Sequence, residues 1–349
     1  MSYLSSILKR CENMAFSELI GQNEAKERLG ASLLSEPGHA FLLVGPAGVG
    51  KKTLAREFAK GLLCSHPTKD GGCGKCPNCT YISAGTHPDY KELLLPSGEK
   101  NIKVADVRSK ILSDVGIMSQ IAERKVYLID ADGLAEEGQN ALLKTLEEPP
   151  KHVVFLLTVS DESKLLPTIL SRTVSVRLLP NKEEEVYEVL RKRNEELSEE
   201  DAKLYAKFSN GVIGYALGLS ESNWLISDWE EVSDLILRLP EISRTELLTD
   251  VYNFFDEERE HFPDILSLMS MVYDEMAICA TVPDSPCLHG EQKKDKMVTV
   301  IKQNHFDAAK IAKCNAILTT AQKAFKANGN FEMIVCRMLL ALKKENSNG

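Results

Sequence analysis

The chain has 349 residues, of which 43% are hydrophobic and 27% are charged, and its formal net charge is −9. This length predicts two or three domains with sizeable cores, and the composition is ordinary for a soluble globular protein. The absence of a run of about 18 apolar residues and of a signal-peptide pattern leads us to expect a cytoplasmic protein.

The charge is unevenly distributed along the chain. Residues 1–180 hold 22 basic and 21 acidic residues, whereas the remaining residues hold 20 basic and 30 acidic ones. An acidic C-terminal part is repelled by nucleic-acid phosphates. We therefore expect any contact with nucleic acid to be modest and to come from the first part of the chain.

Apolar periodicity predicts an α/β domain at the N-terminal end. The predicted strands are Ala40–Val44, Tyr90–Leu95, Val126–Asp130, Val153–Thr158 and Val174–Leu178. The predicted helices are residues 1–15, a helix from Ser17 with apolar Ala25, Leu29, Leu33 and Leu34 at helical spacing, Lys51–Leu63, Ile102–Val115, Gly138–Leu146 and Lys164–Leu170. This alternation predicts a parallel sheet with right-handed crossovers.

Helical patterns alone follow Pro180-Asn181, which marks the first predicted boundary. Residues 181–218 predict three short helices. Longer helices are predicted at Trp224–Leu239, Ile242–Phe255, Pro263–Cys279, Lys296–Ala327 and Phe331–Lys344. The segment Thr281–Asp295 is rich in Pro, Gly and charge, which predicts an exposed loop.

A glycine-rich segment follows the first predicted strand. Residues His39–Thr53 read HAFLLVGPAGVGKKT, in which a strand leads through a loop into a helix. This order is typical of a P-loop, where backbone N–H groups surround phosphate oxygens at a helix N-terminus. We therefore predict a phosphate cradle formed by Gly45, Gly48, Gly50 and Lys51.

One expected ligand is missing from this cradle. The position after the P-loop lysine usually carries a hydroxyl for Mg²⁺, but here it is Lys52, and the hydroxyl of Thr53 lies about 100° further round the helix. A second ammonium group would repel the metal. We expect binding of ATP or ADP to be weak or absent.

The strand Val126–Asp130 ends on an acidic residue, as expected for a carboxylate that holds Mg²⁺ through water. The next residue should be a glutamate acting as general base, but it is Ala131. The nearest substitute is Asp132, and neighbouring residues at a strand end project in different directions. We assign Asp130 to the nucleotide site and expect no ATP hydrolysis by this chain.

Four cysteines have the spacing of metal ligands: Cys64, Cys73, Cys76 and Cys79. Two C-x2-C steps let one tight turn supply three thiolates, and four thiolates suit structural Zn²⁺. A redox C-x-x-C pair is the alternative, although four ligands would close the site. The other cysteines lack this spacing and are predicted to be single thiols: Cys11, Cys279, Cys287, Cys314 and Cys336.

Arg172 follows the predicted helix Lys164–Leu170. An arginine at the edge of such a domain can reach the nucleotide of a neighbouring subunit in an oligomeric ATPase. It can equally close a helix C-terminus against the helix dipole. The sequence alone leaves both interpretations open.

Together these motifs resemble the clamp-loader branch of the AAA+ proteins and, within it, the delta-prime family of bacterial DNA polymerase III. The resemblance is carried by GPAGVGKKT, the four cysteines, AGTHPDY (Ala84–Tyr90), VYLIDADGL, NALLKTLEEPP (Asn140–Pro150), LLPTILSR (Leu165–Arg172) and NGNFEMIVCRMLLAL. Two positions depart from the pattern: Thr173 replaces the family's cysteine, and Gly214-Tyr215 stands where motor subunits carry a lid arginine.

The resemblance implies three domains: an α/β AAA+ core over residues 1–179 with a zinc-binding insert at 64–79, a helical lid at 180–221, and a helical collar at 222–349. It implies zinc on the four cysteines and an Arg172 that acts in trans on a neighbour's ATP. The implied partners are the motor and delta subunits of a heteropentamer, the sliding clamp indirectly, and primed DNA through the assembled complex.

On this basis we expect a catalytically silent, stator-like subunit of the DNA polymerase III clamp loader, which supports clamp loading in DNA replication. Any polymerase activity would belong to the holoenzyme. One alternative is an ATP-hydrolysing motor subunit. Another is a zinc-dependent nucleic-acid binder, in which Lys103, Arg108 and Lys110 of one helix would follow phosphates.

Overall fold

The computed structural model describes residues 15–96, 99, 101–222, 224–282 and 291–347. Packing within the chain separates two compact units. Unit 1 comprises residues 1–193 and 209–217, and unit 2 comprises residues 194–208 and 218–349. The division into three domains at residues 180 and 222 stays a prediction.

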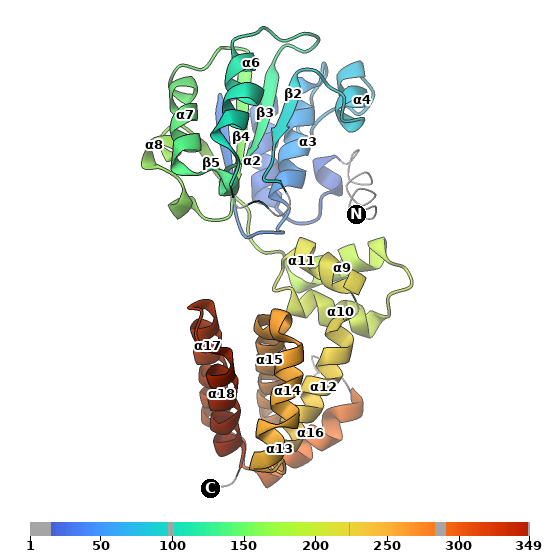
Figure 1. The fold of residues 1–349 in the computed structure, drawn as a ribbon. Coiled ribbons are helices and arrows are strands. Elements are labelled where there is room, and N and C mark those ends of the chain that lie inside the picture. The colour runs from blue at the N-terminus through green and yellow to red at the C-terminus, as the bar shows by residue number, and fades with distance from the viewer. Residues whose placement is uncertain (1–14, 97–98, 100, 223, 283–290, 348–349) are drawn as a thin grey trace. The chain divides into compact units, whose positions relative to one another are not determined.

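Unit 1 is built on a five-stranded parallel sheet in the order β2-β3-β4-β1-β5 (Figure 1). Its strands are β1 (Ala40–Val44), β2 (Tyr90–Leu93), β3 (Lys125–Asp130), β4 (Val153–Val159) and β5 (Val174–Arg177). All residues of β1, β3 and β4 are buried, as continuous apolar runs predict for strands covered on both faces. The predicted strands and the parallel α/β sheet are thus confirmed.

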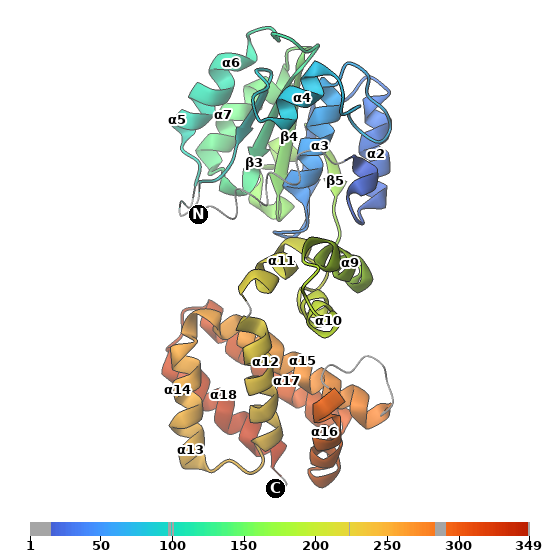
Figure 2. The same cartoon turned by 90° about the vertical axis from the view of Figure 1, so that its right-hand side faces the viewer.

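Helices cover both faces of this sheet (Figure 2). One face carries α2 (Asn23–Leu33) and α3 (Lys51–Leu63). The other carries α5 (Val104–Asp106), a π-helical turn (Val107–Leu112), α6 (Ser113–Val115), α7 (Glu136–Glu147) and α8 (Pro167–Leu170). Unit 1 also contains α4 (Pro77–Ser83), α9 (Glu183–Arg193), the start of α11 (Ile213–Ser222), and 3-10 turns at Phe16–Glu18, Ala131–Gly133 and Glu162–Lys164.

The described residues of unit 2 form helices joined by loops, with no strand. Its helices are α10 (Glu199–Phe208), α12 (Trp224–Arg238), α13 (Arg244–Leu248), α14 (Asp250–Glu257), α15 (Phe262–Thr281), α16 (Glu291–Gln303), α17 (Ala308–Lys326) and α18 (Phe331–Asn346), with a 3-10 turn at Arg259–His261. The centre is α15, which packs against α12, α16 and α17. The Phe262 ring lies 5.1–5.9 Å from the rings of Phe255, Phe325 and Phe331. None of the described helices is both long and apolar enough to cross a membrane.

The predicted helix Lys296–Ala327 is wrong, because two helices, α16 and α17, occupy this region. His305 between them has a left-handed φ of 50°. Asp307 accepts a hydrogen bond from the N–H of Lys310 and so caps the start of α17. A capping side chain satisfies the first free N–H groups of a new helix, and this local signal outweighs the continuous apolar periodicity.

Three further local predictions are wrong. Ile242–Phe255 is divided into α13 and α14 at Thr249. The helix predicted over Lys164–Leu170 begins only at Pro167, since a proline without an N–H fits the first helical position. The helix predicted from Ser17 begins only at Asn23, after a 3-10 turn at Phe16–Glu18, and Leu34, which is 56% exposed, lies one residue beyond its end.

Some predicted elements lie wholly or partly outside the described residues. The predicted helix over residues 1–15 and the cysteines Cys11 and Cys287 fall there. Of the predicted loop Thr281–Asp295, residues 283–290 lie outside, while its last residues belong to α16.

The loop that leads into β3 is held by Asp89, which is 2% exposed. Its carboxylate accepts hydrogen bonds from the backbone N–H groups of Gln120 (2.7 Å), Ile121 (2.8 Å) and Ala122 (3.0 Å). Burial acts to raise the pKa of Asp89, but the three donors outweigh burial and hold this pKa below its ordinary value.

We expect Asp89→Asn to lower the free energy of unfolding by about 2 kcal/mol at pH 7, because charged acceptors form the stronger hydrogen bonds. The depressed pKa means that this stabilisation is complete above the unfolded-state pKa of about 3.9 and is lost as pH falls through the folded-state pKa. Urea denaturation of both proteins at pH 7 and near pH 3 measures the effect. A difference that does not shrink in acid would contradict this account.

Candidate functional site

The P-loop lies between β1 and α3, where the sequence predicts it. Gly48 and Gly50 have left-handed φ values of 82° and 104°, which glycine adopts without steric cost. A Cβ atom on Gly45 would lie 2.5 Å from the carbonyl oxygen of Leu178. These three glycines are therefore required by the shape of the loop itself.

The side chain of Lys51 is folded back on this loop. Its Nζ donates hydrogen bonds to the carbonyl oxygens of Gly45 (2.6 Å) and Pro46 (2.9 Å), and the residue is 7% exposed. Burial lowers the pKa of Lys51, although the nearby carboxylates of Asp132 and Asp130 act in the opposite direction. The ammonium group thus lies across the cradle that the glycines form.

Lys52 and Asp130 form an ion pair at the end of β3. The Nζ of Lys52 lies 2.6 Å from Oδ2 of Asp130, whose side chain is only 7% exposed. A buried carboxylate requires a partner of opposite charge. Lys52 supplies this charge at the point where a P-loop protein usually places its hydroxyl and metal ion.

The two residues after Asp130 do not supply a general base. Ala131 is buried and has no acceptor. The Asp132 carboxylate accepts hydrogen bonds from the N–H and hydroxyl of Ser160, at 2.8 and 2.5 Å, and pairs with Lys164 at 2.8 Å. Burial acts to raise the pKa of Asp132, but these partners outweigh it and lower the pKa. Asp132 is therefore fully engaged within its own chain.

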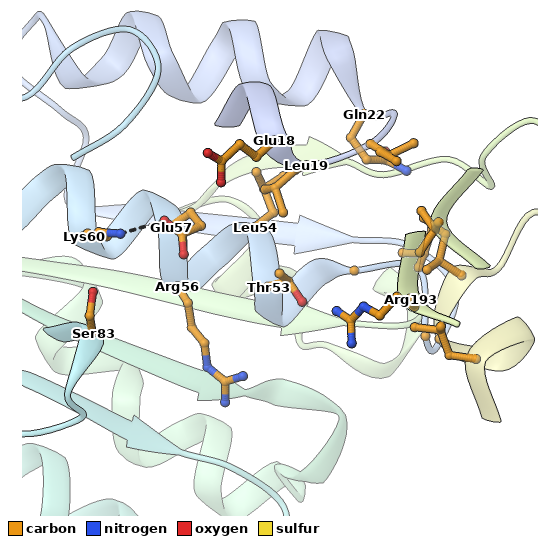
Figure 3. A pocket seen from close by; sticks show the side chains of 18 of the residues that line it. Glu18, Leu19, Gln22, Thr53, Leu54, Arg56, Glu57, Lys60, Ser83 and Arg193 are labelled. Atoms are coloured by element: carbon orange, nitrogen blue, oxygen red, sulfur yellow. Dashed lines mark ion pairs between the residues drawn. The ribbon is translucent and has the colours of Figure 1, made fainter. Parts of the chain in front are cut away.

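A cavity of about 740 Å³ opens beside the P-loop, within unit 1 (Figure 3). Its apolar wall is formed by Leu19, Ile20, Val49, Leu54, Val189, Ile213 and Leu217. Thr53 of α3 and Arg193 of α9 are among the polar residues that line it, together with a buried ion pair between Lys60 and Glu57 at 3.6 Å. Apolar walls with a few polar groups are typical of small-molecule sites.

The start of α11 packs directly on the P-loop. The N–H of Gly214 donates a 2.9 Å hydrogen bond to the carbonyl oxygen of Gly48. A Cβ atom on Gly214 would lie 2.8 Å from that oxygen. The close contact thus leaves no room for an arginine at position 214, where motor subunits are expected to carry one.

The four predicted metal ligands lie together. The Sγ atoms of Cys64, Cys73, Cys76 and Cys79 all lie within 4.8 Å of one another. The Cys64 and Cys76 sulfurs are 3.8 Å apart, close to the ~3.8 Å edge of a tetrahedron with Zn–S bonds of ~2.3 Å. The donor set and its spacing therefore fit a tetrahedral metal ion.

Backbone N–H groups point at these sulfurs. Cys64 Sγ accepts from the N–H of Cys73 at 3.2 Å and from that of His66 at 3.3 Å, and Cys76 Sγ accepts from the N–H of Cys79. Burial raises the pKa of Cys64 and of Cys79, whereas at Cys76 the backbone donors and the neighbouring thiols outweigh burial and lower the pKa to about 6. Such donors favour the thiolate form, which is the form that binds metal.

The Arg172 side chain is 31% exposed and has three contacts within the chain. Nη2 lies 2.8 Å from Oε1 of Glu147. Nη1 donates to the carbonyl oxygen of Thr168 at 2.8 Å and to the Ser171 hydroxyl at 3.1 Å. Glu147, Ser171 and Arg172 line a shallow hollow that also includes His39.

Comparison with known proteins finds similarity to subunits of DNA polymerase III. A family model described as "DNA polymerase III, delta subunit" matches residues 21–182, which include the P-loop, the cysteines and Arg172. The "DNA polymerase III subunit delta'" of Pseudomonas aeruginosa is 45% identical over 141 residues, covering 40% of this chain and 43% of that protein. Both matches cover less than half of this chain, and they show that it is similar to DNA polymerase III delta and delta' subunits.

Relatives of the delta-prime family are also similar. The "DNA polymerase III subunit tau/gamma" of Haemophilus influenzae is 35% identical over 242 residues, which cover 68% of this chain and 34% of that protein. A solved DNA polymerase III gamma subunit-related protein from Thermotoga maritima covers 92% of this chain and 99% of its own at 20% identity, with a TM-score of 0.44. This chain spans less than half the length of the first curated relatives that it matches.

The structure brings together most residues that the sequence singles out, but it also reveals partners that sequence reasoning missed. Glu147, Ser160 and Lys164 were not assigned any role, although each binds a residue of the predicted site. Glu147 lies in NALLKTLEEPP, one of the motifs that carry the family resemblance. The spacing of residues in the sequence does not indicate that Glu147 contacts Arg172.

The basic helix face proposed for nucleic acid is partly paired with acidic residues of the same segment. Lys103 lies 3.7 Å from Glu99, and Lys110 lies 3.7 Å from Asp106, both four residues apart. Such exposed pairs are common on solvated helix faces.

We expect Lys52→Thr to bind ATP several-fold more tightly in the presence of Mg²⁺ than the original chain does. The substitution restores a hydroxyl and frees the Asp130 carboxylate for the hydration shell of the metal. ATP hydrolysis should stay undetectable, because Ala131 still lacks an acceptor. Isothermal titration calorimetry with and without Mg²⁺ measures the binding.

The matched control is Lys52→Met, which removes the charge without adding a hydroxyl and should give a smaller gain. If Mg²⁺ does not strengthen ATP binding to Lys52→Thr, Lys52 is not what blocks the metal.

Proposed function

We propose that this chain is a non-hydrolysing, stator-like subunit of the DNA polymerase III clamp loader, which supplies Arg172 to the ATP site of a neighbouring motor subunit. The observation that carries the proposal is the Lys52–Asp130 ion pair at 2.6 Å. It puts a fixed ammonium group where a hydrolysing subunit needs Mg²⁺.

The surroundings of the ion pair support the same role. Ala131 offers no general base, and the Asp132 carboxylate is occupied by Ser160 and Lys164. Arg172 remains partly exposed on the surface of unit 1. A chain that lacks its own catalytic groups but presents an arginine is suited to complete an active site on another chain.

We propose that the partners are the motor and delta subunits of a heteropentamer, joined through a helical collar at residues 222–349. The α/β core would span residues 1–179 and the helical lid residues 180–221. In this assembly the chain works in the cytoplasm, acts on the sliding clamp indirectly and meets primed DNA only through the complex. The names of the delta' and tau/gamma relatives support a complex with other DNA polymerase III subunits.

We expect Arg172→Ala to lower ATP hydrolysis at the neighbouring site by on the order of 10³-fold, because an arginine in trans stabilises charge on the transferred phosphoryl group. The total rate of ATP hydrolysis by the complex should fall by the fraction that this one site contributes. Steady-state ATPase assays of the reconstituted complex measure it. Arg177→Ala is the matched control, since Arg177 is also exposed and paired with a glutamate.

An unchanged rate with Arg172→Ala would end the trans role. The similarity to tau/gamma subunits favours an ATP-hydrolysing motor as the second candidate. Appreciable ATP turnover by the pure, isolated chain would support that candidate instead.

We further propose that Cys64, Cys73, Cys76 and Cys79 hold a structural Zn²⁺ ion. Four ligands close the coordination shell, so the ion would stabilise the turns around α4 rather than take part in chemistry. The left-handed Gly71 (φ 104°) allows one of these turns.

We expect the purified chain to contain one Zn²⁺ per molecule, and Cys76→Ser to contain much less, because three thiolates bind more weakly than four. Metal analysis and a colorimetric chelator measure the content. Cys336→Ser changes a partly buried thiol outside the cluster and should keep the full content. Equal zinc in both variants would contradict the assignment.

A further inference from the structure

The contacts of Arg172 come from two different elements. Thr168 and Ser171 belong to the same turn as Arg172, so their contacts move with α8. Glu147 is the last residue of α7, and its carboxylate reaches the guanidinium from outside that turn. A long arginine side chain needs such an external contact to hold one rotamer at the surface.

The buried side-chain amide of Gln139 connects α7 to the segment before α8. Gln139 of α7 is 4% exposed. Its Nε2 donates to the carbonyl oxygen of Lys164 at 3.0 Å, and its Oε1 accepts from the N–H of Leu166 at 2.9 Å. These bonds fix α7 to the segment that leads into α8, so Glu147 and Arg172 face each other on anchored backbones.

We propose that Glu147 is a positioning residue, whose carboxylate holds the Arg172 guanidinium in the orientation in which it meets the phosphates of the neighbouring subunit. This inference rests on the trans role of Arg172 proposed above. The three contacts use three of the five N–H donors of the guanidinium, so others remain for a phosphate oxygen.

Partial exposure makes this arrangement compatible with phosphate binding. The Glu147 side chain is 48% exposed and that of Arg172 is 31% exposed. Water screens the attraction between exposed charges, so Glu147 does not cancel the charge that Arg172 offers. The hydrogen bond between Glu147 and Arg172 still fixes the direction of the guanidinium. Donors that are oriented in advance lower the activation free energy, because they need no reorganisation in the transition state.

The test measures ATP hydrolysis by the reconstituted complex that contains the full-length chain. Glu147→Ala should lower kcat at the served site roughly two- to fivefold, the size expected for an exposed ion pair, and leave KM for ATP unchanged. Glu147→Gln keeps an acceptor and should restore most of the rate. Glu148→Ala removes a charge at the next, exposed position and should match the original chain.

A double-mutant cycle with Arg172→Ala makes the test specific. If Glu147 acts through Arg172, Glu147→Ala has no further effect once Arg172 is gone. The thermal midpoint of each variant shows that the fold is kept, and Glu147→Gln preserves the packing most closely.

The outcomes separate the two proposals. A loss of rate with Arg172→Ala but an unchanged or increased rate with Glu147→Ala overturns the positioning role and leaves the trans role standing. An unchanged rate with Arg172→Ala overturns both. A loss with Glu147→Ala that persists in the Arg172→Ala background also overturns the positioning role.

Discussion

The ion pair between Lys52 and Asp130 is the interaction on which the functional edge of unit 1 depends. Asp130 ends the buried strand β3, and a buried carboxylate is unstable without a compensating charge. In a motor protein the metal and its ligands help to supply this charge. Here the first turn of α3 supplies it from within the chain, so the P-loop can keep its shape with no metal ion.

The same principle recurs along this edge of the sheet. Asp132 is paired with Lys164 and bonded to Ser160, and Arg172 is paired with Glu147. Charges that a motor subunit would direct at nucleotide, metal or water are here bound by neighbours in the same chain. The Arg172 side chain is 31% exposed, which is compatible with a role toward another chain.

Sequence reasoning succeeded where the signal is local. The apolar runs of β1, β3 and β4 predict buried parallel strands, and the C-x2-C steps predict a cluster because a short turn brings such thiols together. It failed where a single residue interrupts a pattern. The cap at Asp307 separates α16 from α17, although the apolar periodicity runs through both.

The sequence by itself determined the order of strands and helices, the glycine-rich loop, the cysteine set and the absence of a glutamate after Asp130. Each of these depends on residues that are close together in the chain. The tertiary structure alone decided that Lys52 pairs with Asp130, that Gly214 contacts Gly48, and that Glu147 holds Arg172. These partners are far apart in sequence. The strand order β3-β4-β1 brings Lys52 to Asp130, and the packing of α7 beside α8 brings Glu147 to Arg172.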